Sequence, residues 1–152
     1  MKRLLSLLLL FCLILSATSC ALPTSDEPPI ESGASCRVVL ATDPVMEYTV
    51  DLTDLSVDEG LMSLLKHLNE TEGLTYAEES GAYGAYLTAV GSLVAKGSSY
   101  ISIYTSVAED FDVSSYATTA TYDGVTLTSS GFGASQMKIR DGAIYYICLA
   151  TY

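Results

Sequence analysis

The sequence has one histidine, His67, no tryptophan, and only seven lysines and arginines against 18 acids among its 152 residues. The shortage of histidine argues against a metal centre or a catalytic relay built from imidazole side chains. The formal net charge of −11 argues against nucleic acid as a partner, because phosphate binding needs a footprint of lysine and arginine. No lysine followed by serine or threonine accompanies the glycine pairs, so no phosphate-binding loop is predicted for Gly81, Gly84, Gly131 and Gly133. We therefore expect neither an enzyme nor a cofactor.

A nearly unbroken apolar run near the N-terminus contributes much of the 49% hydrophobic content. Lys2 and Arg3 precede this run, which covers residues 4–15, and small residues follow it up to Cys20. Basic, then apolar, then small residues form the pattern of a secretory signal peptide. The run is shorter than the roughly 20 apolar residues of a transmembrane helix. We predict that residues 1–19 are a signal peptide and that the protein is exported.

The residues before Cys20 resemble the lipobox of bacterial lipoproteins, although the lipobox usually has leucine where this chain has Ala17. The resemblance implies acylation of Cys20 and a protein held on the outer face of the cell membrane. Ordinary cleavage, for instance after Ala21, would instead give a secreted protein. Removal of residues 1–19 takes two of the seven bases and none of the 18 acids, so the net charge falls from −11 to −13. Because anionic headgroups repel such a surface, we expect membrane attachment through the lipid.

The rest of the chain divides into a tether and one domain. Residues 20–35 are rich in proline, serine and acids and show no apolar period, which predicts a tether. Residues 36–152 have the length of one ordinary domain.

The domain shows strand patterns on both sides of one helical pattern. Apolar residues recur at helical spacing, Ser56 and Glu59 form a capping-box pattern, and Gly73 follows the run of Val57, Leu61, Leu64, Leu65 and Leu68. Strands are predicted at 36–41, 46–52, 74–78, 83–90, 100–107 and 143–149, and the polar segment 108–121 is predicted to be a long loop or an irregular edge. The order predicts an α+β fold that is β-grasp-like, a mostly antiparallel sheet with one main helix packed on one face.

The order of these segments resembles the DUF4430 family, the transcobalamin-like C-terminal domains of exported bacterial proteins. The resemblance rests on the apolar helix, Tyr83-Gly84-Ala85-Tyr86 followed by Gly91, the aromatic segment 100–106, and the turn at Asp141-Gly142. The family usually has tryptophan at the position of Tyr100 and a second aspartate at that of Ala143. The resemblance implies the fold and, by analogy with cobalamin carriers, a small-molecule ligand such as a corrinoid.

Four of the eleven tyrosines are candidate ligand-binding residues, namely Tyr83, Tyr86, Tyr100 and Tyr104. They fall in two predicted strands that we expect to be adjacent. A tyrosine has an apolar face and a polar tip, which suit a flat ligand, a sugar or a protein partner, but aromatic residues also pack across strands. A pocket between the two strands would favour a small-molecule binding module, whereas a flat face would favour a surface interaction or adhesion module that binds protein or polysaccharide.

Cys36 and Cys148 lie in the first and last predicted strands, which are neighbours in a β-grasp fold. An exported domain permits a disulfide between them, and the alternative is two buried thiols. The sequence leaves both alternatives open.

Acidic residues gather in two groups that lack the spacing of a calcium-binding EF-hand loop. We interpret them as solvated and predict no metal site at Asp51, Asp54, Asp58 and Glu59 or at Glu109, Asp110 and Asp112.

Overall fold

The structure is a computed structural model that describes residues 33–152. The predicted signal peptide, Cys20 and most of the predicted tether lie outside the described residues. None of the helices in the described part is long and apolar enough to span a bilayer.

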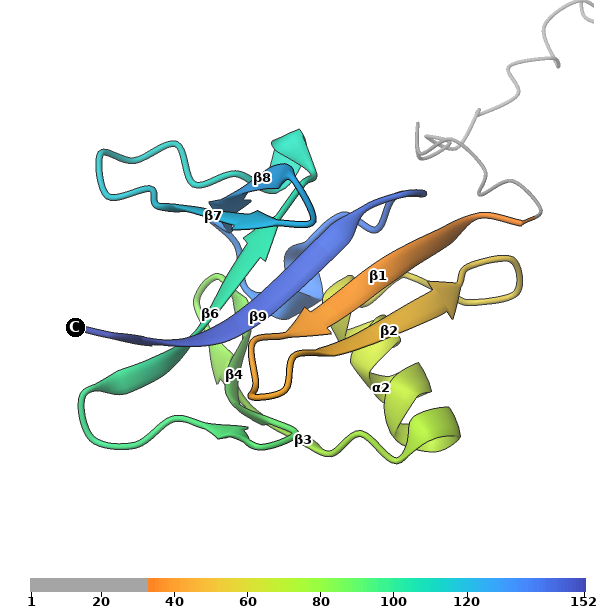
Figure 1. The fold of residues 1–152 in the computed structure, drawn as a ribbon, viewed down its shortest axis with the longest axis horizontal. Helices are drawn as coiled ribbons and strands as arrows, with labels where there is room; N and C mark the ends of the chain where they lie inside the picture. The colour runs from red at the N-terminus through yellow and green to blue at the C-terminus, as the bar shows by residue number, and fades with distance from the viewer. Residues whose placement is uncertain (1–32) are drawn as a thin grey trace, which may run out of the picture.

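The main sheet has six strands and runs through the centre of the molecule (Figure 1). Its strands are β1 (Ser35–Leu40), β2 (Met46–Asp51), β6 (Ser99–Thr105), β7 (Thr119–Tyr122), β8 (Val125–Ser129) and β9 (Ile144–Thr151). They are ordered β2-β1-β9-β6-β8-β7. The first and last strands of the domain, β1 and β9, are parallel neighbours, and the other pairs in this sheet are antiparallel. The predicted α+β class and the predominance of antiparallel pairing are confirmed.

A second sheet of three strands corrects one expectation. It consists of β3 (Tyr76–Gly81), β4 (Gly84–Val90) and β5 (Leu93–Val94), in the order β3-β4-β5. The two tyrosine-bearing strands, β4 and β6, were expected to be adjacent in one sheet and instead belong to different sheets. The reason is the turn at Gly91, which has a φ of 56° and leads the chain back from β4 into β5 rather than onward to β6.

Helix α2 (Leu61–Glu72) packs on one face of the main sheet, near β1 and β2 in Figure 1. The leucines that were predicted to form its apolar face are all buried, namely Leu61, Leu64, Leu65 and Leu68. The predicted end is also confirmed, because Gly73 closes the helix in the left-handed region with a φ of 69°.

The predicted capping box at the start of α2 is wrong. The helix begins after Gly60, and the Ser56 hydroxyl donates instead to the Asp58 carboxylate at 2.8 Å. Gly60 has a φ of 56°, and a Cβ atom there would lie 2.6 Å from the carbonyl oxygen of Met137. Close packing against the segment around η2 (Ala134–Gln136) therefore requires glycine at this position.

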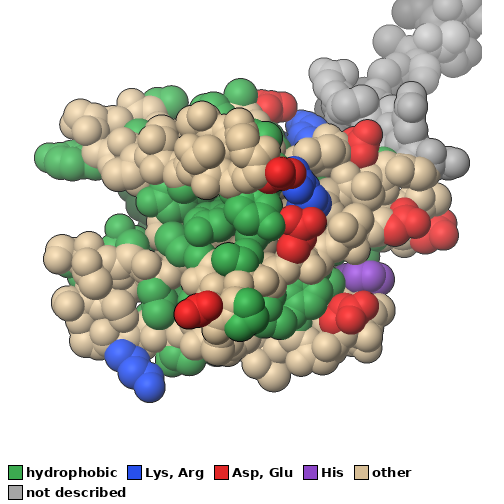
Figure 2. All heavy atoms as spheres, viewed as in Figure 1, with side chains coloured by type: hydrophobic (Ala, Val, Ile, Leu, Met, Phe, Trp, Pro, Cys, Tyr) green, Lys and Arg blue, Asp and Glu red, His purple; other side chains and the backbone are tan. Residues whose placement is uncertain are grey.

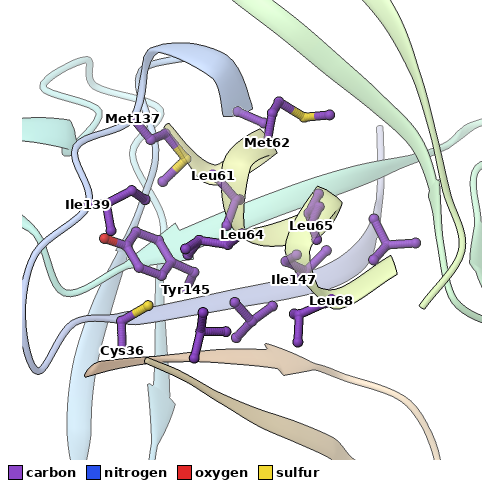
Figure 3. Packing of buried hydrophobic residues seen from close by; sticks show 14 of the residues in the cluster. Cys36, Leu61, Met62, Leu64, Leu65, Leu68, Met137, Ile139, Tyr145 and Ile147 are labelled. Atoms are coloured by element: carbon purple, nitrogen blue, oxygen red, sulfur yellow. The ribbon is translucent and has the colours of Figure 1, made fainter. Parts of the chain in front are cut away.

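The main core lies between α2, the inner face of the main sheet and the second sheet. Figure 3 shows the α2 leucines pointing toward Ile147 and Tyr145 of β9, with Cys36 of β1 beside them. The Tyr145 hydroxyl donates to the Lys138 carbonyl at 2.7 Å and accepts from the Arg140 N–H at 3.2 Å, so its polar end is satisfied inside the core. Burial raises the pKa of Tyr145, which keeps this hydroxyl protonated.

The main sheet bends so that its own edge hairpin, β7–β8, lies over the face opposite α2. A small cluster forms there from Val39, Leu127 and Ile144, with three tyrosines packed against it, Tyr104, Tyr122 and Tyr146. Figure 2 shows the apolar side chains gathered in this region of the face. The hairpin is fixed at its tip because the Tyr122 hydroxyl donates to Glu47 at 2.7 Å and Arg37 donates to Asp123 at 3.0 Å.

Candidate ligand-binding site

A cavity of about 400 Å³ lies between the β3–β4 hairpin, β6 and the loop at 130–133. Its wall includes four aromatic residues, Tyr83, Tyr86, Tyr100 and Phe132, together with serines from three different segments, Ser80, Ser102 and Ser130. Cavities of this size hold small organic molecules, and apolar walls with a few polar groups are typical of such sites.

The β3–β4 hairpin is held in place at its turn. The Gly133 N–H donates to the Tyr83 carbonyl, and the Ala85 N–H donates to the Ser135 hydroxyl at 2.8 Å. The backbones approach so closely that a Cβ atom on Gly133 would lie 2.4 Å from the Tyr83 carbonyl oxygen. These contacts position Tyr83 at the rim, where 73% of its surface is exposed.

One wall of the cavity is an edge of β6 that no strand covers along its first half. β8 pairs with β6 only at Tyr104 and Thr105, whereas β9 pairs with β6 along its whole length. The Ile103 carbonyl accepts from the Ser130 N–H at 2.8 Å on the side away from β9. Because strand residues two apart direct their backbone groups to the same side, the N–H and C=O of Ile101 face that side as well. Ile101 lines the cavity and so offers it one backbone donor and one acceptor.

The aromatic residues of the cavity continue into a neighbouring ring. Tyr152 packs on Tyr100 with ring centroids 4.8 Å apart and planes inclined by 31°. Burial, followed by the interactions with the Tyr152 hydroxyl, Tyr100 and Glu79, raises the pKa of Tyr86. The three tyrosines, Tyr86, Tyr100 and Tyr152, therefore form one interacting group beside the cavity.

The structure brings together three of the four candidate tyrosines. Tyr83, Tyr86 and Tyr100 line the cavity, but Tyr104 is not part of its wall. The Tyr104 hydroxyl lies 3.0 Å from that of Thr118, and its ring packs against Tyr146 with centroids 6.4 Å apart. Tyr104 thus has the packing role that the sequence left as the alternative for all four.

The loop at 130–133 and the glycines of the hairpin also line the cavity and were not predicted as site residues. Gly81, Gly84, Gly131 and Gly133 all line it, although they were considered in the sequence only as a phosphate loop. The sequence feature that could have identified this loop as part of the site is Gly131-Phe132-Gly133, an aromatic residue between two glycines. Phe132 has 44% of its surface exposed, and its neighbours lack side chains that could cover it.

Cys36 and Cys148 are both free, and the register of β1 and β9 does not allow a disulfide. Arg37 pairs with Ile144 and Leu40 with Ile147, so Cys148 lies about five positions beyond the neighbour of Cys36. That offset corresponds to about 16 Å along the strands, whereas a disulfide needs Cα atoms within about 7 Å. Of the two alternatives, the structure has the two thiols.

No group of three or more histidine, cysteine, aspartate or glutamate side chains able to hold a metal occurs within residues 33–152. The expectation that both acidic groups are solvated is wrong for one residue. Asp110 has 1% of its surface exposed, and its carboxylate accepts the Lys138 N–H at 2.9 and 3.1 Å. This carboxylate fixes the segment before β9 and is structural. His67 lies half-buried on α2, away from the cavity.

No model of a known protein family matches the sequence, and no curated protein matches it. Among solved structures, the chain is similar to haptocorrin in complex with Cbi, with a TM-score of 0.55 and 15% sequence identity. The match covers 83% of this chain and 27% of haptocorrin, so the chain spans about a quarter of that protein's length. A protein from Ruminococcus gnavus named as a candidate metal-binding protein matches with a TM-score of 0.49 and 17% identity, over 78% of this chain and 98% of its own. The haptocorrin match supports a transcobalamin-like fold.

Proposed function

We propose that this protein is a non-catalytic, exported ligand-binding protein whose domain holds a small molecule in the cavity between the β3–β4 hairpin and β6. The observation that carries the proposal is the cavity itself. Residues of the β3–β4 hairpin, of β6 and of the loop at 130–133 line a hollow of about 400 Å³ that is open to solvent on one side. Aromatic walls supply apolar contact area, and the serines and the Ile101 backbone supply groups that orient a ligand.

A corrinoid is the first ligand to test. The sequence resembles the DUF4430 family, and the fold is similar to part of haptocorrin, which was solved in complex with Cbi. The strand order β2-β1-β9-β6, with parallel β1 and β9 at its centre and α2 on one face, supports the finer assignment of a β-grasp-like domain. The cavity would enclose part of a ligand as large as a corrinoid and leave the remainder outside.

The attachment to the membrane is proposed from the sequence. Acylation of Cys20 would tether the domain to the outer face of the cell membrane, with residues 20–35 as the spacer. Mass spectrometry of the mature N-terminus tests this, with an acylated Cys20 expected and an unmodified terminus after Ala21 as the contrary result.

A surface interaction module is the second candidate, and one observation favours it. Val113 and Tyr116 have 97% and 87% of their surfaces exposed on the loop between η1 (Ala108–Asp110) and β7. Large exposed apolar side chains of this kind serve as anchors in protein interfaces. If this candidate is correct, Val113→Ser and Tyr116→Ser will abolish binding of a protein or polysaccharide partner.

A thermal-shift panel of corrinoids and sugars tests ligand binding. We expect a ligand that raises the melting temperature of the wild-type protein and of Tyr104→Ala, but not of Tyr100→Ala. Tyr104 is the matched control because it lies on the same strand outside the cavity. Equal shifts in the two variants would place the ligand elsewhere, and the absence of any shift across the panel would contradict the proposal for these classes.

A further inference from the structure

The cavity between the β3–β4 hairpin and β6 has walls that suit a positively charged group. Aromatic residues line it from three segments: Tyr83 and Tyr86 from the hairpin, Tyr100 from β6, and Phe132 from the loop at 130–133. The face of an aromatic ring carries partial negative charge and attracts a cation placed within about 6 Å of its centre. Rings on several sides of one space can each contribute to this attraction.

Glu79 adds a formal negative charge to the same wall. It lines the cavity and is the direct cross-strand partner of Tyr86 in the β3–β4 pair. Glu79 also contributes to the raised pKa of Tyr86, which places its charge within electrostatic range of that hydroxyl. The preceding residue, Glu78, pairs instead with the buried Leu87 and is not part of the cavity wall.

None of the described lysine, arginine or histidine side chains lines this cavity. Arg37 is on β1, outside the cavity wall, and pairs with Glu47 at 3.5 Å and with Asp123 at 3.0 Å. An anionic ligand would therefore meet Glu79 without a compensating positive charge, which is unfavourable in a partly desolvated site.

We propose that the cavity selects an organic cation, a quaternary or alkylated ammonium group, through its aromatic rings and Glu79. The inference rests on the proposed small-molecule function and adds the chemical class of the group that enters the cavity. A quaternary ammonium group cannot donate N–H hydrogen bonds and is weakly hydrated, so it exchanges water for aromatic faces at little cost. The serines and the Ile101 backbone remain available for the neutral part of such a ligand.

Choline and 3,3-dimethylbutan-1-ol form the test pair, because they have nearly the same shape and differ by the positive charge. We would titrate each into the full-length protein and follow binding by ligand-observed NMR. We expect choline to bind at least about fivefold more tightly than the neutral isostere, a difference in the range of one favourable cation–π site. Equal affinities, or no binding of choline at millimolar concentration, would overturn the inference.

Two charge-neutralising variants test whether the Glu79 carboxylate contributes to the preference for choline. Glu79→Gln should weaken choline binding about threefold, as expected for one partly exposed ion pair, and leave the neutral isostere unchanged. Glu78→Gln is the matched control, because it removes the same charge from the adjacent position outside the cavity, and it should change neither affinity. An equal loss in both variants would show a general charge effect and contradict a specific role for Glu79.

The inference and the proposed function fail in different ways. A neutral ligand from the panel of corrinoids and sugars that binds in a Tyr100-dependent manner, together with equal binding of choline and its isostere, overturns the cation preference and retains the ligand-binding function. If no ligand of any charge binds in a Tyr100-dependent manner, both are overturned.

Discussion

Whether a tyrosine of β6 lines the cavity depends on the segments that pack beside it, as Tyr100 and Tyr104 show. Both are on β6 and on the same face, four positions apart. Tyr100 faces the cavity because β8 does not reach its end of the strand, whereas Tyr104 is covered by Tyr146 and the segment that contains Thr118. The sequence could identify the tyrosines as unusual but could not separate these two roles, because the extent of β8 pairing is a tertiary property.

Asp110 is a residue whose titration should affect stability. Burial raises its pKa above the ordinary value near 3.8, and the hydrogen bond from the Lys138 N–H opposes this only in part. The folded state therefore holds the proton more tightly than the unfolded chain does. Asp110 contributes stability that is present below pH 3.8 and is lost as the pH rises through its pKa in the folded state.

The measurement is urea unfolding of the wild type and Asp110→Asn between pH 3 and 7. The free energy of unfolding of the wild type should fall relative to that of the variant as the pH rises, since the variant cannot ionise at this position. Asp54→Asn, at an exposed position, is the control for general charge effects. A difference between wild type and Asp110→Asn that stays constant or grows with pH would show that Asp110 is not the source.

At the scale of elements, α2 was largely predictable and the β3–β4 hairpin was not. The helical spacing of Leu61, Leu64, Leu65 and Leu68 identified the buried face of α2, because that face is set by a period within one segment. The start of the helix was mispredicted because Gly60 is fixed by contact with Met137, 77 positions away in the chain. The second sheet was missed for the same reason, since its place beside β6 depends on distant contacts at Gly133 and Ser135.

The contact between the β3–β4 hairpin and Gly133 should be essential for the shape of the cavity. Gly133→Ala would place a Cβ atom 2.4 Å from the Tyr83 carbonyl oxygen, so the hairpin or the loop must move. We expect a loss of about 1–3 kcal/mol in the free energy of unfolding, together with weaker binding of any cavity ligand.

Gly131→Ala provides a graded comparison in the same loop. Its Cβ atom would lie 3.2 Å from the nearest atom, the Cα of Asp112, which a small shift relieves. Urea denaturation of both variants should therefore show the larger loss for Gly133→Ala. A Gly133→Ala protein as stable as the wild type would contradict the close approach of the hairpin and the loop.

Within residues 33–152, α2 and the second sheet pack against one face of the main sheet, and the sheet bends so that its own β7–β8 hairpin lies over the other face. The prediction that the first and last strands are neighbours is confirmed by the pairing of β1 with β9, but the parallel direction of that pair was not predicted. The cavity was not predictable as a volume, since it forms where three segments separated in the sequence come together. Its tyrosines were predicted, whereas Phe132 and the glycines became recognisable only with the fold.

The reactivity of the Cys36 and Cys148 thiols tests their burial and the register of β1 and β9. Burial raises the pKa of Cys36 to about 12 and also raises that of Cys148, so neither is ionised in the folded protein at neutral pH. Both should resist iodoacetamide in the native state and react fully in urea without a reductant. Peptide mass mapping reads each site separately, and a disulfide-linked peptide from Cys36 and Cys148 would contradict the register of β1 and β9.

Binding of a small molecule among the cavity tyrosines can be followed at each tyrosine by ¹⁹F NMR of the protein labelled with 3-fluorotyrosine. Resonances are assigned by single tyrosine-to-phenylalanine variants and followed during titration with corrinoids, sugars and choline. We predict that at least one ligand shifts the signals of Tyr83, Tyr86 and Tyr100 and leaves those of Tyr48 and Tyr104, which lie outside the cavity, unchanged. Ligand-induced shifts confined to tyrosines outside the cavity, or no shift with any ligand, would contradict it.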